Sequence, residues 1–191
     1  LLLAILVFIG KKRVIPFVTE KRQWIITVFM TLIAIRFMIG NIINLPVLDF
    51  RPYKVGTDLR SEVLGSIKNP ELSDFSLMNG DMDDITEELL TDSGYTFLLV
   101  LPHVEDASEN GIDLIGDVFD YCINWGYNMI GVTSSGDDAI RQWSDNAGVD
   151  LRFMFCDEVP LQTMVRSNPG LVLIKDGVLI NKWSCYSVPS D

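Results

Sequence analysis

Cysteine and histidine are scarce in this sequence. Its 191 residues include three cysteines and one histidine. The cysteines (Cys122, Cys156 and Cys185) stand far apart, so the chain has no Cys-x-x-Cys pair and no Cys/His spacing of a zinc site. We therefore expect no catalytic residue, no cofactor and no metal, and spacing alone identifies no disulfide pair.

Each cysteine has its own expected setting. Cys122 falls on the apolar face of a predicted helix, where a cysteine is most simply a small core residue. Cys156 ends a predicted strand beside Asp157 and Glu158, and such acidic neighbours disfavour a thiolate. Cys185 lies near the C-terminal end and is expected to be the most exposed of the three.

Basic residues are also few, and they are unevenly placed. Six of the 15 basic residues but only one of the 26 acidic residues lie in residues 1–48, which gives this part a net charge of +5. The rest of the chain carries −16. Nucleic-acid binding depends on clustered Lys and Arg, so the acidic part excludes it. A basic, apolar head before an acidic tail predicts a membrane segment followed by a soluble domain.

Two apolar stretches occur in the head. Residues 1–9 would cover only ~13 Å as a helix, short of a ~30 Å hydrocarbon core, so we expect the end of a longer truncated membrane helix. Residues 24–46 have the length of a complete span, with Trp24 as an interfacial anchor. Arg36 within it either forms a buried polar site or faces protein or the interface in a larger bundle. A buried helix of a soluble protein is a further alternative.

Residues 10–23 hold five basic residues, which marks this loop as cytoplasmic. The predicted span then exits the membrane, so the acidic part lies outside. In a bacterium with two membranes this places the span in the inner membrane and the domain in the periplasm.

Residues 47–73 contain Pro, Gly and charge without sustained periodicity, and we expect a linker there. A folded domain is expected over residues 74–191, with alternating strands and helices. The predicted strands are 74–78, 95–104, 127–133, 151–156, 171–174 and 178–183, and the helices are 86–90, 112–125, 135–148 and a short one before Asn168. This order predicts an α/β domain with a mixed central sheet flanked by helices.

The segment MVRSNPGLVLIKDG, residues 164–177, organises the end of the domain. Pro169 cannot donate a ladder hydrogen bond, so it is expected at the first residue of its strand. The Asn168–Pro169 bond is also a favourable place for a cis peptide.

This order resembles the thioredoxin fold. The phrases DFRPYKVG, GYTFLLV and RSNPGLVLIKDG resemble, more specifically, a bacterial membrane family with a DoxX-type (MauE-like) helical bundle and a C-terminal periplasmic thioredoxin-like domain. The resemblance implies that most of the membrane bundle precedes this chain. It also implies a cleft beside Asn168 and Pro169, with His103 nearby.

The chain departs from the thioredoxin pattern at the active position. Thioredoxin-like enzymes place Cys-x-x-Cys at the start of the helix after the first central strand, where the helix N-terminus lowers the thiol pKa. Residues 102–113 take that place here, and they contain no cysteine. Four acidic residues are present instead: Glu105, Asp106, Glu109 and Asp113.

The other candidates have simpler interpretations. A lone histidine such as His103 is more often a loop residue than a base. The acidic pairs 83–84, 87–88 and 137–138 lack EF-hand spacing and are more typical of solvated helix starts.

Two functional hypotheses remain. The favoured one is a membrane-anchored, non-catalytic binding or docking module. Its partners would be the lipid bilayer, its own missing membrane bundle and a periplasmic protein or peptide, but no nucleic acid. The alternative is a thiol-disulfide oxidoreductase or peroxidase-like enzyme that uses a displaced cysteine, Cys156 or Cys185.

Overall fold

The computed structural model describes residues 19–43, 51–65, 69–70, 72, 74–109 and 111–188. The predicted truncated helix at 1–9 and most of the basic loop at 10–23 lie outside these residues. The chain forms two compact units, residues 1–42 and 43–191. We describe each unit by itself.

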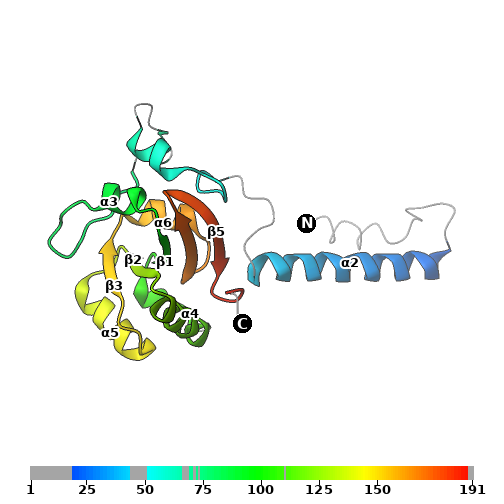
Figure 1. The fold of residues 1–191 in the computed structure, drawn as a ribbon. Helices are drawn as coiled ribbons and strands as arrows, with labels where there is room; N and C mark the ends of the chain where they lie inside the picture. Colours follow the sequence, from blue (N-terminus) through cyan, green and yellow to red (C-terminus); the bar gives the residue numbers. More distant parts are fainter. Residues whose placement is uncertain are drawn as a thin grey trace. The chain divides into compact units, whose positions relative to one another are not determined.

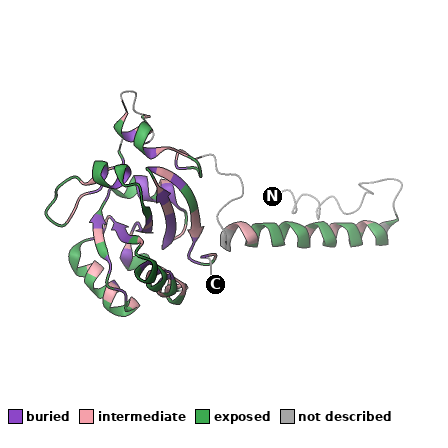
Figure 2. Cartoon of the chain, viewed as in Figure 1, coloured by how far each residue is buried: buried purple, intermediate pink, exposed green. Residues whose placement is uncertain are grey.

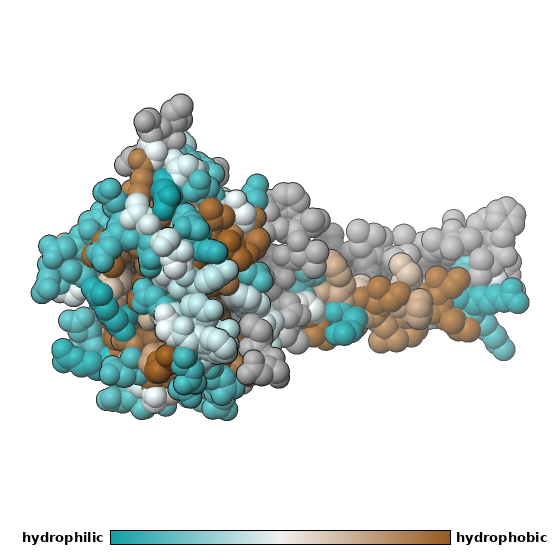
Figure 3. All heavy atoms as spheres, viewed as in Figure 1, coloured by the Kyte–Doolittle hydropathy of each residue, from teal (hydrophilic) through white to brown (hydrophobic). Residues whose placement is uncertain are grey.

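The first unit contains one long helix, α2 (Glu20–Ile43). Its segment Lys21–Asn41 is long and apolar enough to cross a membrane. Figure 2 shows that most of α2 is exposed, and Figure 3 shows that it carries mainly hydrophobic side chains. The helix begins before the expected residue Trp24, and residues 44–46 of the predicted span lie outside the described part. A single apolar helix near the N-terminus fits either a membrane anchor or a signal sequence.

The second unit contains the sheet (Figure 1). Its strands are β1 (Tyr95–Leu101), β2 (Asn128–Thr133), β3 (Arg152–Phe155), β4 (Gly170–Lys175) and β5 (Val178–Ser184). Its α-helices are α3 (Thr86–Thr91), α4 (Ile112–Trp125), α5 (Asp137–Ala147) and α6 (Glu158–Met164). A π-helical turn, η1 (Arg60–Leu64), and a 3-10 turn, η2 (Val104–Asp106), complete the elements.

The five strands are ordered β3-β2-β1-β4-β5. The pairs β1–β2 and β2–β3 are parallel, whereas β1–β4 and β4–β5 are antiparallel. Successive parallel strands are joined by α4 and α5, and the sheet ends in a hairpin. This arrangement is the predicted thioredoxin-like fold, which is confirmed.

Alternate residues of β1 point into two separate cores, one on each face of the sheet. Leu98 and Val100 pack with α3 and α6, in a cluster that includes Leu161 and Met164. Leu99 and Leu101 pack on the other face with α4 and α5. The continuous apolar run of β1 follows from this burial on both faces.

The predicted linker is part of the domain from Tyr53 onward, so the expected boundary at Asp74 is too late. Tyr53, Leu59, Val63 and Leu72 are at most 5% exposed and belong to the first core. The Leu59 N–H donates to the Gly177 carbonyl at 2.9 Å, which ties this stretch to the β4–β5 turn. These four buried residues could not be recognised from the sequence, because the stretch packs as coil and a single π-helical turn and so has no regular hydrophobic period.

Several element boundaries also differ from expectation. The expected strand at 74–78 is reduced to single bridges from Met78 to Asp84 and Phe155. β1 ends at Leu101 instead of Val104, because Pro102 has no N–H to continue the ladder. The helix before Asn168 ends at Met164. α4 has the predicted bounds, and glycines with left-handed φ angles (Gly111 and Gly126) flank it.

Candidate functional site

The sheet topology brings the loop after β1 to the turn before β4. β1 and β4 are antiparallel neighbours, and Val100, near the end of β1, is paired with Gly170, the first residue of β4. The loop that begins at Pro102 and the Asn168–Pro169 turn therefore lie at the same edge of the sheet. The Asn168–Pro169 peptide bond is cis, and Pro169 directly precedes the strand.

Asn168 joins these two segments through two hydrogen bonds. Its side-chain Nδ2 donates to the His103 carbonyl at 2.6 Å, and its own carbonyl accepts the Ser108 N–H at 2.8 Å. The three cleft residues predicted from the sequence (Asn168, Pro169 and His103) are thus brought together. The loop is fixed at two points, near its beginning and near its middle.

The same turn contains unused hydrogen-bonding capacity. Asn168 Oδ1 and Ser167 Oγ are inaccessible to solvent and have no hydrogen-bond partner in the described part of the chain. Most buried polar atoms in folded proteins are paired, so two such atoms in adjacent residues are unusual. Both atoms are enclosed by the protein, so a further donor could reach them only if the turn opened locally.

The side chain of His103 pairs with the first residue of α6. His103 Nε2 lies 3.0 Å from Glu158 Oε1, and both side chains are partly exposed. Glu158 Oε1 also accepts a hydrogen bond from Gln162 Nε2. The hydrogen bond with Glu158 raises the His103 pKa above its ordinary value, and the nearby charges of Asp106 and Glu105 act in the same direction. Sequence reasoning missed Glu158, because its partner is 55 residues away and no local pattern connects them.

Ser135, just after the end of β2, holds the loop that follows β1, which we call the acidic loop (residues 102–113). This buried residue donates from Oγ to Glu105 Oε2 at 2.6 Å and accepts the Val104 N–H at 3.1 Å. The Ser135 hydrogen bond lowers the Glu105 pKa below its ordinary value. A carboxylate is therefore fixed in the loop in which a thioredoxin-like enzyme carries its thiols. Sequence reasoning also missed Ser135, which only the parallel β1–β2 pairing brings to the loop.

The three cysteines cannot replace the missing thiols as they stand. Cys122, Cys156 and Cys185 are free and at most 2% exposed. Burial raises the thiol pKa of Cys122 to about 11 and that of Cys156 to about 12, and it also raises the pKa of Cys185. The thiolate is the reactive form of cysteine, and a raised pKa disfavours it, so each of these side chains is an inert core residue.

The prediction that Cys185 is exposed was wrong. The turn after β5 packs against the start of α4, where the backbone carbonyl of Cys185 lies against the α-carbon of Gly111. A Cβ at Gly111 would collide with this carbonyl. The near-terminal position of Cys185 gave no sign of this contact.

A cavity of about 570 Å³ adjoins the site at the carboxyl ends of β2 and β3. Ser134 and Ser135 line it on the side of the acidic loop. Met82 and Phe155, which are 69% and 38% exposed, line it as well. Two large exposed apolar side chains in a hollow next to a hydrogen-bonding turn could accept an apolar side chain of a ligand.

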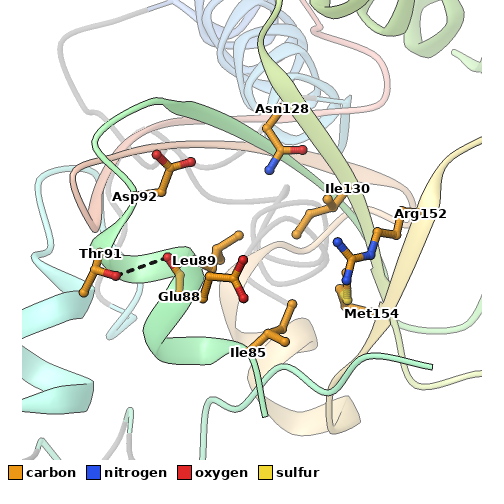
Figure 4. A pocket seen from close by; sticks show the side chains of 9 residues that line it. All are labelled: Ile85, Glu88, Leu89, Thr91, Asp92, Asn128, Ile130, Arg152 and Met154. Atoms are coloured by element: carbon orange, nitrogen blue, oxygen red, sulfur yellow. Dashed lines mark hydrogen bonds between the residues drawn. The ribbon is translucent and has the colours of Figure 1, made fainter. Parts of the chain in front are cut away.

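A second cavity, of about 320 Å³, lies at the other end of the same strands and contains none of the predicted site residues. Figure 4 shows Glu88, Asn128 and Arg152 directed toward one space from α3, β2 and β3. Its apolar lining includes Leu89, Ile130 and Met154, which are at most 8% exposed. Because these side chains are already buried by the protein, the cavity offers a ligand little apolar contact.

Within the described ranges, no group of three or more His, Cys, Asp or Glu residues is placed to hold a metal ion. The acidic pairs at 87–88 and 137–138 lie in the first turns of α3 and α5. The Asp84 carboxylate accepts the Thr86 N–H, and hydrogen bonds from Thr86 lower the Asp84 pKa. These acids stabilise helix starts through the favourable interaction of negative charge with the helix N-terminus.

Comparison with known proteins finds no matching family model and no matching curated protein. Among solved structures, the chain is similar to PrxQ of Xylella fastidiosa, with 13% identity and a TM-score of 0.44 over 71% of this chain and 88% of that one. It is also similar to an uncharacterized thioredoxin-like protein from Porphyromonas gingivalis, with 13% identity and a TM-score of 0.45 over 60% and 80%. A thiol peroxidase from Chromobacterium violaceum gives 14% identity and a TM-score of 0.41 over 56% and 70%.

Proposed function

We propose that this chain is a membrane-anchored, non-catalytic docking module whose thioredoxin-like domain binds an extended peptide segment of a protein partner. The observation that carries the proposal is the state of the thiols. The loop at 102–113 contains no cysteine, and all three cysteines are buried with raised pKa values. A thiol mechanism therefore lacks an accessible nucleophile, whereas Asn168, Pro169 and His103 lie together as the proposed cleft requires.

The cleft has the features that an extended segment requires. Asn168 Oδ1 and Ser167 Oγ are buried without a partner in the described chain, and local opening of the turn on binding would let them accept hydrogen bonds from the segment. The adjoining cavity offers Met82 and Phe155 to an apolar side chain. Backbone hydrogen bonds supply affinity in this mode of recognition, and side-chain pockets supply specificity.

The charge of the cleft favours a basic partner. Glu105 and Asp106 lie in the loop, and Glu158 faces it from α6. The Glu158 hydrogen bond and the charges of Asp106 and Glu105 raise the His103 pKa, so these carboxylates favour the protonated form of this imidazole. An extended segment with Lys or Arg would therefore be attracted to this edge, whereas an acidic one would be repelled.

We further propose that α2 anchors the domain to the inner membrane of a bacterium with the domain in the periplasm. The apolar segment Lys21–Asn41 and the basic residues of loop 10–23 support this orientation. Membership of the DoxX-type (MauE-like) family belongs to the same proposal, and it rests on the resemblance of the quoted sequence phrases. A helical bundle of that family would be the second partner of the domain.

The alternative is a thiol oxidoreductase or peroxidase-like enzyme acting through Cys156 or Cys185. It would require local opening, because both side chains are at most 2% exposed. The pKa of about 12 for Cys156 keeps its thiol protonated at neutral pH. Burial therefore favours the docking module over this alternative.

The proposal can be tested with an array of unstructured peptides of graded net charge, probed with the full chain in detergent. We expect basic peptides to bind at low salt and to be lost in Asn168→Ala, which removes the central side chain of the cleft. Asn146→Ala, on the exposed face of α5, is the matched control and should bind as the unmodified chain does. Equal binding by the Asn168 variant, or a preference for acidic peptides, would contradict the proposal.

A further inference from the structure

The domain carries a cluster of aromatic side chains far from the cleft, which we call the aromatic patch. It consists of Tyr95, Tyr121, Trp125 and Tyr127. The rings form a continuous series, with centroid distances of 6.1 Å from Trp125 to Tyr121, 5.9 Å from Tyr121 to Tyr127 and 5.6 Å from Tyr127 to Tyr95. The series joins the last turn of α4 to the beginnings of β1 and β2.

The patch is open to solvent. Trp125 is 68% exposed, whereas Tyr121 and Tyr95 are 41% and 38% exposed. Single exposed apolar residues are common on proteins, but contiguous groups of large ones mark interaction surfaces. Tyr and Trp combine an apolar ring with a polar tip, which suits a boundary between water and an apolar phase.

The patch lies beside the least charged stretch of a strongly acidic domain, and its acidic neighbours on α4 are the exposed Asp117 and Asp120. Residues 121–136, from Tyr121 to Gly136, contain no charged residue at all. Lys175 borders the patch, with its Nζ 4.6 Å from the centroid of the Tyr95 ring. The low charge of residues 121–136 suits contact with an electrically neutral lipid layer.

The patch and the cleft are at opposite ends of the same strands. Tyr95 begins β1 and Tyr127 precedes β2, whereas Pro102 and Ser134 follow the ends of the same strands. A strand of seven residues such as β1 spans about 20 Å. Binding at the patch would therefore leave the cleft at the far end of the strands.

We propose that the aromatic patch docks onto the lipid interface of the membrane that holds α2, so that the cleft faces away from the bilayer. This inference rests on the proposed membrane anchoring of α2. The seven residues between Ile43 and Arg51 reach about 25 Å at full extension, so an anchored domain remains close to the lipid. Tyr and Trp gather at the lipid–water interface in membrane proteins, and a lysine there can extend its charge toward water.

The test uses the full chain in phosphatidylcholine nanodiscs with a nitroxide spin label on single engineered cysteines. The native cysteines are buried, so labelling is selective for the new position. Asn124→Cys places the label inside the patch, and Asp138→Cys places it at the start of α5. Depth is read from collisions with oxygen, which enters lipid, and with a water-soluble nickel chelate, which does not.

We expect the nickel collision rate to be on the order of tenfold lower at Asn124→Cys than at Asp138→Cys, because a polar chelate is excluded from the apolar phase. The double change Tyr121→Ser with Trp125→Ser should restore the collision rate at Asn124→Cys. Aqueous rates at both positions, or interfacial depth that persists in the double variant, would overturn the docking proposal. Binding of a protein to the patch in place of lipid would give the aqueous result.

A third label, on Ile33→Cys in the middle of α2, separates this proposal from the one on which it rests. A label deep in the hydrocarbon at Ile33→Cys, together with aqueous rates at Asn124→Cys, would reject patch docking and retain the anchor. Aqueous rates at Ile33→Cys would reject the anchor itself, and with it both proposals.

Discussion

The Asn168 side-chain amide donates to the His103 carbonyl at 2.6 Å across 65 residues of sequence. This bond joins the loop after β1 to the turn before β4, the two segments that form the cleft. The adjacent Ser108 N–H donates to the Asn168 carbonyl. Asn168 therefore ties together the two segments of the proposed cleft through its side chain and its backbone carbonyl.

Changing Asn168 to Asp should destabilise the domain, because the change removes the donor and brings a carboxylate oxygen toward the His103 carbonyl. We expect a loss of about 1–3 kcal/mol in the free energy of unfolding, measured by urea denaturation. Asn146→Asp, on the exposed face of α5, should cost little. An Asn168→Asp variant as stable as the unmodified chain would show that this hydrogen bond does not hold the cleft.

His103 should titrate above the ordinary histidine value, because the Glu158 hydrogen bond favours its charged form. Its imidazole signal in an NMR titration is unambiguous, since the chain has one histidine. A raised folded-state pKa adds stability that is fully present below the unfolded pKa and is lost as the pH rises through the folded pKa.

Glu158→Gln should shift the His103 titration toward lower pH, and Glu87→Gln, on α3, should leave it in place. Because Asp106 and Glu105 also raise this pKa, added salt should lower it in the unmodified chain. A titration that is unaffected by Glu158→Gln would mean that the pair does not form in solution.

Gly111 should tolerate alanine less well than Gly126. Both residues have left-handed φ angles, +85° and +70°, in which an added Cβ costs about 1–2 kcal/mol. At Gly111 the Cβ also meets the Cys185 carbonyl, whereas at Gly126 no atom lies within 4 Å. Urea denaturation should therefore give a larger loss for Gly111→Ala. Equal losses would show that the Cys185 turn moves aside freely.

The stretch expected as a linker should behave as core. Leu59 is fully buried, so Leu59→Ala should cost about 2–5 kcal/mol in unfolding free energy. Leu64, at the end of the π-helical turn that follows Leu59, is 37% exposed, and Leu64→Ala should cost much less. A small effect of Leu59→Ala would mean that residues 51–65 are dispensable for the fold.

Much of the fold follows from local patterns. α4 has the predicted bounds because its apolar residues recur at helical spacing and glycines end it on both sides. β1, β2 and β4 are continuous apolar runs that match strands buried on both faces. The position of Pro169 just before β4 could likewise be predicted, because proline cannot pair inside a central strand.

The rest depends on contacts between residues far apart in sequence. The buried residues between Tyr53 and Leu72 follow neither a helical nor a strand period, so this stretch has the sequence pattern of a linker. Their burial comes from contacts with the rest of the core, which the local sequence does not show. Glu158 and Ser135 reach the cleft only through the sheet order. Burial of Cys185 likewise depends on its contact with Gly111.

The most direct test of the non-catalytic account is thiol reactivity of the full chain, followed with a small alkylating probe between pH 5 and 9. Each single Cys→Ser variant would be measured in parallel, together with an insulin-reduction assay. The account predicts slow labelling of Cys122, Cys156 and Cys185 across this range and no insulin reduction. Rapid labelling of one cysteine with an apparent pKa well below the ~8.5 of a free thiol, together with reductase activity that its serine variant loses, would contradict it.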